Sequence, residues 1–128
     1  MGEISKVIKG ATSPLAWLTS GRAPVDPRLA DKRAFICASC PKNGDGPLTG
    51  WFTEPAAKAI GEAIEERHKL KMETHYDESL GTCTACFCVL VVKVWEPLDI
   101  ALKHLPAEAR KDLWENCWMK TEESQKLP

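Results

Sequence analysis

Cysteines are the residues of this chain whose type and spacing point most clearly to chemistry. Four of the six form two C-x-x-C pairs, Cys37 with Cys40 and Cys83 with Cys86. Each pair spans one tight turn, so both sulfurs can bind the same ion, and tetrahedral zinc accepts four thiolates at about 2.3 Å. The gap between the pairs exceeds the usual spacing of roughly 15–20 residues, so it must hold an inserted helix. We therefore predict that the four sulfurs converge on one metal centre.

The other two cysteines, Cys88 and Cys117, leave two alternatives open. Cys88 begins an apolar segment, and Cys117 follows Ala109 and Leu113 at helical spacing. Either thiol could therefore be a small buried apolar side chain. Against this, the C-x-x-C-x-C run concentrates more thiols than core packing requires. All six cysteines are thus candidate metal ligands.

Two kinds of metal group suit these thiols. Zinc fits two cysteine knuckles on a small fold and needs nothing else. A [4Fe-4S] cluster also uses four thiolates and tolerates spread spacing, although the compact cysteine run of bacterial ferredoxins is absent. We predict zinc, with the [4Fe-4S] cluster as the alternative and a two-metal site with bridging sulfurs as a lesser one.

No other catalytic constellation is visible in the sequence. His68, His75 and His104 are not arranged as a hydrolase site, although His75 could be a spare ligand. A thioredoxin-like C-x-x-C lies between a strand and a helix, whereas Cys37 is expected to enter a loop. Glycine-rich phosphate loops and nucleophile elbows are missing. We predict a non-enzymatic protein.

The composition predicts one globular domain. The chain has 128 residues, of which 44% are hydrophobic and 27% charged. A formal net charge of −1 disfavours nucleic-acid binding, which needs a basic surface. No apolar run approaches the ~20 residues of a membrane helix, and the N-terminus lacks an apolar signal segment. We expect a reducing cytoplasm, where cysteines bind metals more often than they form disulfides.

Helix start and stop signals predict a helical arm over residues 1–35. Apolar spacing indicates a short helix over residues 4–11. Ser13 and Pro14 form a cap signal for a helix that stops at Gly21, and Asp26 begins another toward Arg33.

The central part should form the metal-binding domain, over residues 36–119. Glycine, proline, asparagine and aspartate predict a loop over residues 36–50. A helix capped by Thr53 should then run to His68, followed by a short strand over residues 70–74. The helix should bury its apolar face and expose its acidic face, as four residues can test: Ile60, Ile64, Glu62 and Glu66.

The last third should hold one strand and two helices. The apolar, β-branched run over residues 87–95 predicts a central strand. Pro97 and Pro106 should each begin a helix, and the polar tail over residues 120–128 should fray. Trp51 and Trp95 are expected to pack over the metal site. The predicted fold class is α+β, a small metal-stapled domain with two cysteine knuckles, a short sheet and several short helices.

Most of the chain resembles a family of small cysteine-rich proteins encoded by tailed bacteriophages and prophages. The cysteine pattern C-x-x-C … C-x-x-C-x-C … C-W is the specific part of the resemblance. The residues that carry it are Trp17-Leu18, Gly21, Pro24-Val25, Leu29-Ala30, Arg33 to Pro41 with Asn43, Trp51-Phe52-Thr53, Leu80-Gly81, Cys83, Cys86, Cys88, Lys93-Val94, Pro97-Leu98 and Cys117-Trp118.

The resemblance implies phage origin and metal binding, with all six cysteines as candidate ligands. The predicted function is structural, as a minor virion component of the tail or baseplate or as an assembly factor. This prediction rests on the lack of catalytic groups, the near-zero net charge and several tryptophans that could reach the surface. Its partners would be other phage proteins, and the protein could form an oligomer. It would lie in the host cytoplasm or be incorporated in the virion. One alternative is a zinc-ribbon-like regulator that binds nucleic acid or a host protein through basic clusters such as residues 67–71. Another is an iron–sulfur electron carrier.

Overall fold

The computed structural model describes residues 13–44, 47–86, 88–105 and 107–126. Over these residues helices pack together with one two-stranded sheet, which agrees with the predicted α+β class. The side chains of residues 47–57 and 126 are not described, and the helix expected over residues 4–11 lies outside the described ranges. Within those ranges, no helix is both long enough and apolar enough to cross a membrane.

The first two helices follow their predicted signals at their starts and stops. A helix over residues 13–20 ends at Gly21, whose φ of 72° favours glycine. Helix α2 (Pro27–Ser39) follows Asp26, whose carboxylate accepts a hydrogen bond from the N–H of Arg28. The helix continues beyond Arg33, so the loop predicted from residue 36 is wrong for residues 36–39. No residue breaks the helix before Pro41, which disfavours a helical Cys40.

Helix α3 (Pro47–His68) begins before the predicted cap at Thr53, which is therefore wrong. Pro47 suits a first helical position because its φ is fixed and it needs no hydrogen-bond acceptor. The predicted faces are confirmed. Ile60 and Ile64 are buried, whereas Glu62 and Glu66 are exposed.

Both predicted strands of the second half are wrong. Residues 70–74 form no strand, and the run over residues 87–95 contains helix α4 (Leu90–Lys93). A short run buried on all sides suits a helix as well as a strand, because periodicity cannot separate the two. The observed sheet pairs β1 (Asn43–Gly44) with β2 (Thr82–Cys83) in antiparallel register, with Asn43 opposite Cys83.

The C-terminal third is helical to residue 126. A one-turn 3-10 helix, η1 (Asp77–Ser79), precedes β2, and α5 (Leu98–Lys103) follows Pro97 as predicted. Helix α6 (Ala107–Asp112) ends before Cys117. Helix α7 (Trp118–Lys126) replaces the predicted fraying of residues 120–126. Its first turn is held because Trp118 is buried.

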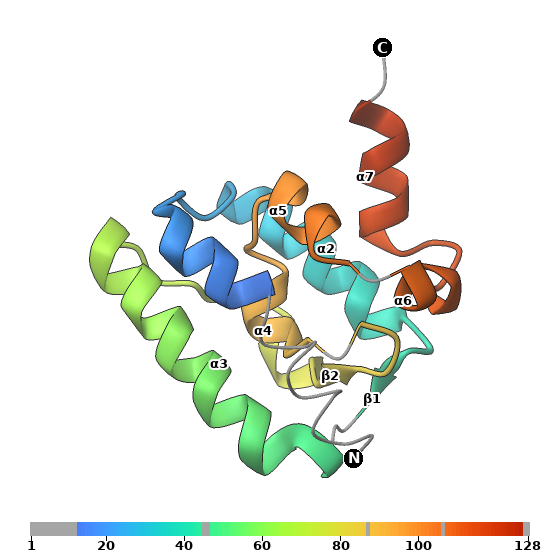
Figure 1. Ribbon diagram of the computed structural model, residues 1–128, viewed down its shortest axis with the longest axis horizontal. Coiled ribbons are helices and arrows are strands. Elements are labelled where there is room, and N and C mark those ends of the chain that lie inside the picture. The colour runs from blue at the N-terminus through green and yellow to red at the C-terminus, as the bar shows by residue number, and fades with distance from the viewer. Residues whose placement is uncertain (1–12, 45–46, 87, 106, 127–128) are drawn as a thin grey trace.

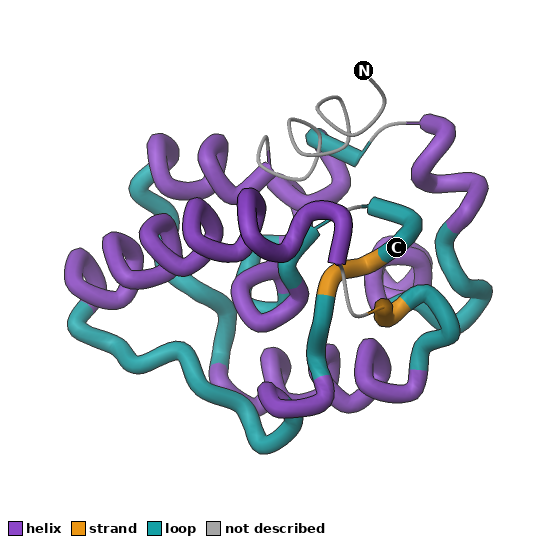
Figure 2. The backbone as a smooth tube through the Cα atoms, turned by 90° about the horizontal axis from the view of Figure 1, so that it is seen from below, coloured by secondary structure: helices purple, strands orange, loops and turns teal. Residues whose placement is uncertain are grey.

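Helix α4 lies at the centre of the molecule and contacts both α2 and α3 (Figure 1). The helix over residues 13–20 lies beside α3, where the Arg67 guanidinium donates to the Leu18 carbonyl at 2.7 Å. Figure 2 shows the two short strands side by side. The sheet thereby joins the end of α2 to the segment that precedes α4.

Candidate functional site

Five of the six cysteines line one small cavity, with a volume of about 20 Å³. We call it the sulfur cavity. Its sulfur-bearing residues come from the end of α2, from β2 and the following turn, and from the link between α6 and α7: Cys37, Cys40, Cys83, Cys86 and Cys117. Other side chains close its walls, among them Leu90, Leu113, Trp114, Trp118 and Met119. The fold thus gathers thiols that are far apart in sequence.

The first pair lies where α2 ends. Cys37 is on the last turn of the helix, and the indole N–H of Trp118 donates to its sulfur at 3.3 Å. The N–H of Cys40 caps the helix by donating to the Cys37 carbonyl at 3.1 Å. The sulfur of Cys40 accepts from the N–H of Lys42 at 3.3 Å. The chain therefore turns tightly around these two thiols.

The second pair lies on β2 and in the turn after it. The sulfur of Cys83 accepts from the backbone N–H groups of Ala85 and Cys86, each at 3.3 Å. The turn is joined to the first pair because the Thr84 N–H donates to the Lys42 carbonyl at 2.8 Å. These backbone donors favour a negatively charged sulfur.

Hydrogen bonding and burial separate the pKa values of these thiols. The Cys86 thiol, together with the two backbone N–H groups, lowers the pKa of Cys83 to about 6. The same shared proton raises the pKa of Cys86, which stands between Cys83 and Cys88. Burial raises the pKa of Cys37 to about 12 and also raises that of Cys117. The pKa is therefore lowered at Cys83 and raised at Cys37, Cys86 and Cys117.

Cys88 does not line the sulfur cavity. It is buried behind Cys86, with its sulfur 3.6 Å from the Cys86 carbonyl oxygen. The hydrogen bond with Cys86 and the charge of Lys93 lower its pKa. The structure therefore places Cys117 with the two C-x-x-C pairs and leaves Cys88 one layer outside.

A buried lysine, which the sequence patterns did not single out, also lines the sulfur cavity. The side chain of Lys93 is 2% exposed and lies 3.6 Å from the Glu96 carboxylate, which is 0% exposed. Its ammonium donates to the Ser13 hydroxyl at 3.2 Å, and that hydroxyl donates to Glu96. A lysine inside an apolar run, followed three residues later by a glutamate, was the available signal in the sequence.

Trp118 is the second contributor without a predicted role at the metal site. The guanidinium of Arg33 stacks over its ring in a cation–π contact, 4.0 Å from the ring centroid, while the indole N–H donates to the Cys37 sulfur. Trp95 is buried but does not line the cavity, so it does not have the predicted position over the thiols. The side chain of Trp51 is outside the described residues. His75 is engaged elsewhere, with its ring 2.6 Å from Asp31.

The described side chains do not form a ready-made metal site. Among them, no group of three or more cysteine, histidine, aspartate or glutamate side chains is arranged to hold an ion. Five of the thiols nonetheless line one cavity. The cavity volume is close to the space of one water molecule, which needs about 10–15 Å³.

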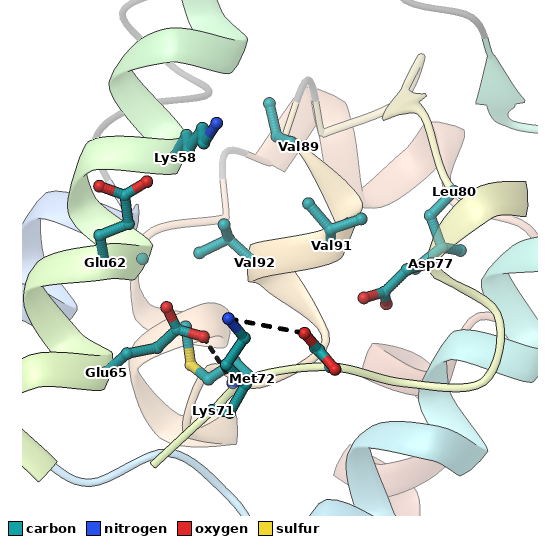
Figure 3. A pocket seen from close by; sticks show the side chains of 12 residues that line it. Lys58, Glu62, Glu65, Lys71, Met72, Asp77, Leu80, Val89, Val91 and Val92 are labelled. Carbon is teal, nitrogen blue, oxygen red and sulfur yellow. Dashed lines mark hydrogen bonds and ion pairs between the residues drawn. The ribbon is translucent and has the colours of Figure 1, made fainter. Parts of the chain in front are cut away.

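A larger open cleft of about 440 Å³ lies on the side of α4 that faces α3 (Figure 3). Its floor is apolar, with Val89, Val91 and Val92, and its rim is charged. Several rim groups are already engaged within the protein. The Glu65 carboxylate accepts from the Met72 N–H at 2.6 Å, and Lys71 pairs with Glu73 at 3.7 Å.

Comparison with known proteins gave no match, whether with family models, curated proteins or solved structures.

Proposed function

We propose that this protein binds one zinc ion in the sulfur cavity, through the thiolates of Cys37, Cys40, Cys83 and Cys117. The observation that carries the proposal is the convergence of thiols from three separate parts of the chain on one small enclosed space. Unpaired buried thiols need no such convergence, because each packs as well alone in a core.

Hydrogen-bond donors beside three of the four sulfurs would stabilise thiolates, whereas burial raises the pKa of Cys37 and of Cys117. Cys40 and Cys83 both accept backbone N–H groups, and Cys37 accepts an indole N–H. Metal-bound sulfur must be deprotonated, and donors of this kind stabilise the negative charge. In this proposal the thiols rotate toward the cavity centre as the ion binds, which couples binding to local ordering.

The choice of Cys117 over Cys86 as the fourth ligand rests on where each residue lies in the chain. Cys117 lines the sulfur cavity from the α6–α7 link, so as a ligand it would tie a third part of the chain to the metal. Cys86 instead shares its proton with Cys83 and Cys88. We assign Cys86 to a supporting position beside Cys83, and Cys88 to the layer behind it.

The small size of the cavity suits a single ion. A space of about 20 Å³ is close to that of one water molecule, so one ion among its ligands is the simplest occupant. A bound zinc ion would staple the end of α2, the strand β2 and the α6–α7 link together.

Elemental analysis of the anaerobically purified full chain, with an absorption spectrum, tests the proposal. We expect about one zinc per chain and no visible colour. A visible sulfur-to-iron band with stoichiometric iron would instead establish the cluster. If the reduced chain retains neither metal and takes up no added Zn²⁺, the proposal fails.

The biological role remains a prediction: a non-enzymatic, minor virion component or assembly factor with other phage proteins as partners. Its absence from purified particles would contradict the virion role. The regulator alternative predicts salt-dependent retention on DNA, and the electron-carrier alternative predicts the iron chromophore. A metal ion that joins three parts of the chain would suit the structural role.

A further inference from the structure

The open cleft of about 440 Å³ lies between α3 and the segment over residues 71–80, with α4 at its floor (Figure 3). We call it the valine cleft, because Val89, Val91 and Val92 line it. Gly61 of α3 also lines it and adds no side chain. A Cβ atom at Gly61 would lie 3.4 Å from Val92 Cγ2, so a larger side chain would narrow the cleft. Its volume is in the range of ligand-binding pockets, roughly 300–1,000 Å³.

The rim of the valine cleft carries carboxylates on both sides. Figure 3 shows Glu62 and Glu65 on one side of the valines and Asp77 on the other. Glu65 accepts from the Met72 N–H at 2.6 Å, and Asp77 accepts from the hydroxyl of Thr74 at 2.6 Å. These donors are neutral, so they orient the carboxylates and leave the negative charges in place. Among the described residues, no ion pair neutralises the three groups.

The lysines of the rim do not balance these charges. Lys71 pairs with Glu73 at 3.7 Å, and Lys58 is exposed and forms no ion pair with a described residue. The cleft thus combines an apolar floor with an excess of negative charge. A complementary occupant has positive groups attached to apolar parts. Lysine and arginine side chains have this character, because their apolar stems pack on hydrophobic surface while their charged heads stay in water.

We propose that the valine cleft is a docking site for a basic, apolar peptide segment of a partner protein. Aliphatic side chains and stems of the segment pack on the valines, and its cationic groups lie beside Glu62, Glu65 and Asp77. The open shape favours a chain segment over a small molecule, because small-molecule pockets enclose most of the surface of their ligands. Charge complementarity of this kind speeds association and selects the partner. The docking site is separate from the sulfur cavity and does not require a bound metal.

Fluorescence anisotropy with the full chain tests the docking site, using a labelled peptide of alternating leucine and arginine. We expect saturable binding that weakens as salt is raised, and little binding of the matched peptide with glutamate in place of arginine. The double variant Glu65→Gln/Asp77→Asn keeps the hydrogen-bond acceptors and should weaken binding by about fivefold. Its matched control is Glu66→Gln/Glu78→Gln, because both carboxylates are exposed and neither lines the cleft. The control should bind within about twofold of the unaltered protein, since solvent and salt screen these charges.

Gly61→Met tests the apolar floor, because its side chain would extend over Val92 into the cleft and should reduce peptide binding. Far-ultraviolet circular dichroism checks that each variant folds. Three results would overturn the docking site: no binding of the arginine–leucine peptide, equal binding of the glutamate peptide, or equal losses in the double variant and its control. Displacement of the peptide by spermidine, but not by sodium chloride of equal ionic strength, would identify a small organic cation as the occupant and overturn the peptide assignment.

Discussion

Cys88 and Cys117 are both buried, but only Cys117 lines the sulfur cavity. Cys117 lines the sulfur cavity from the link before α7, whereas Cys88 lies behind Cys86. The two residues therefore form a matched pair for separating a ligand from a core thiol. Each is changed to serine, which alters one atom and keeps the size of the side chain.

Cys117→Ser should abolish stoichiometric zinc retention and loosen the C-terminal helix, because it removes the only proposed ligand from that part of the chain. Metal content per chain and the fluorescence of Trp114 and Trp118 report the two effects. Cys88→Ser should cost roughly 1–3 kcal/mol through its buried hydroxyl and leave the zinc content unchanged. Unchanged zinc in Cys117→Ser, with loss in Cys86→Ser, would instead identify the two C-x-x-C pairs as the ligands.

Trp118→Phe tests the hydrogen bond to Cys37 at the same scale. The substitution removes the indole N–H that donates to the sulfur at 3.3 Å. We expect weaker zinc binding and a loss of stability larger by about 1 kcal/mol than that of the control. The control is Trp95→Phe, because the buried N–H of Trp95 has no hydrogen-bond partner among the described residues. Equal losses of stability and affinity in both variants would show that ring volume alone matters.

At the scale of the secondary-structure elements, Gly81 matters because it allows β1 and β2 to approach each other closely. A Cβ atom at Gly81 would lie 1.8 Å from the carbonyl oxygen of Gly44, which no side-chain rotation can relieve. Gly81→Ala should therefore displace one strand, costing about 1–3 kcal/mol and lowering zinc affinity through Cys83. Urea unfolding and chelator competition measure the two losses. A variant with native stability and affinity would refute this function of the glycine.

Gly61→Ala should raise the free energy of unfolding, whereas Gly81→Ala should lower it. Its added Cβ would meet Val92 Cγ2 at 3.4 Å and Met72 Cε at 3.6 Å, both ordinary contact distances. Glycine inside a helix is less favourable than alanine by roughly 0.5–1 kcal/mol, so the substitution should stabilise α3 by about that amount. Thermal unfolding measures the change, and a lower unfolding midpoint would contradict the expectation.

Among the secondary-structure elements, the sequence predicted correctly those helix starts and stops that depend on neighbouring residues alone. The Asp26 cap, the Gly21 stop and the helix after Pro97 were all predictable, because each depends on a few neighbouring residues. The run over residues 87–95 was not, since complete burial erases the periodicity that distinguishes a helix from a strand. Helix α7 was missed because its polar sequence is held by tertiary contacts.

In the candidate site too, some features could be predicted from local sequence and others depend on tertiary packing. Spacing alone singled out the cysteines, because a C-x-x-C turn brings two sulfurs together locally. The positions of Cys117, Cys88, Lys93 and Trp118 depend on how distant elements pack. The sequence separation of these residues carries no signal for such packing.

Arg33 connects the parts of the whole molecule. Its buried guanidinium donates to the carbonyls of Val94 and Glu96 at 3.0 and 2.7 Å, and it binds both carboxylate oxygens of Glu122 at 2.9 and 2.7 Å. It thereby joins α2, the segment after α4, and α7. Because it also stacks on Trp118, it is linked to the wall of the sulfur cavity.

Glu122→Ala should detach α7, because it leaves the buried Arg33 without its carboxylate. We expect a loss of about 3 kcal/mol and faster hydrogen exchange over residues 118–126. Glu123→Ala is the neighbouring control, since the pair of Glu123 with Arg110 is partly exposed and should contribute less than about 1 kcal/mol. Equal effects of the two substitutions would show that the Arg33 pair does not anchor the helix.

The sulfur cavity also has a consequence for the order of events during synthesis. Its walls are completed by Leu113, Trp114 and Cys117, which are translated long after Cys37 and Cys40. A nascent chain that stops short of them presents an open groove of reduced thiols. Because these contacts join residues far apart in the sequence, the thiols can be enclosed only after the C-terminal part of the chain has been made. Until then the growing chain is vulnerable to oxidants and to stray soft metal ions.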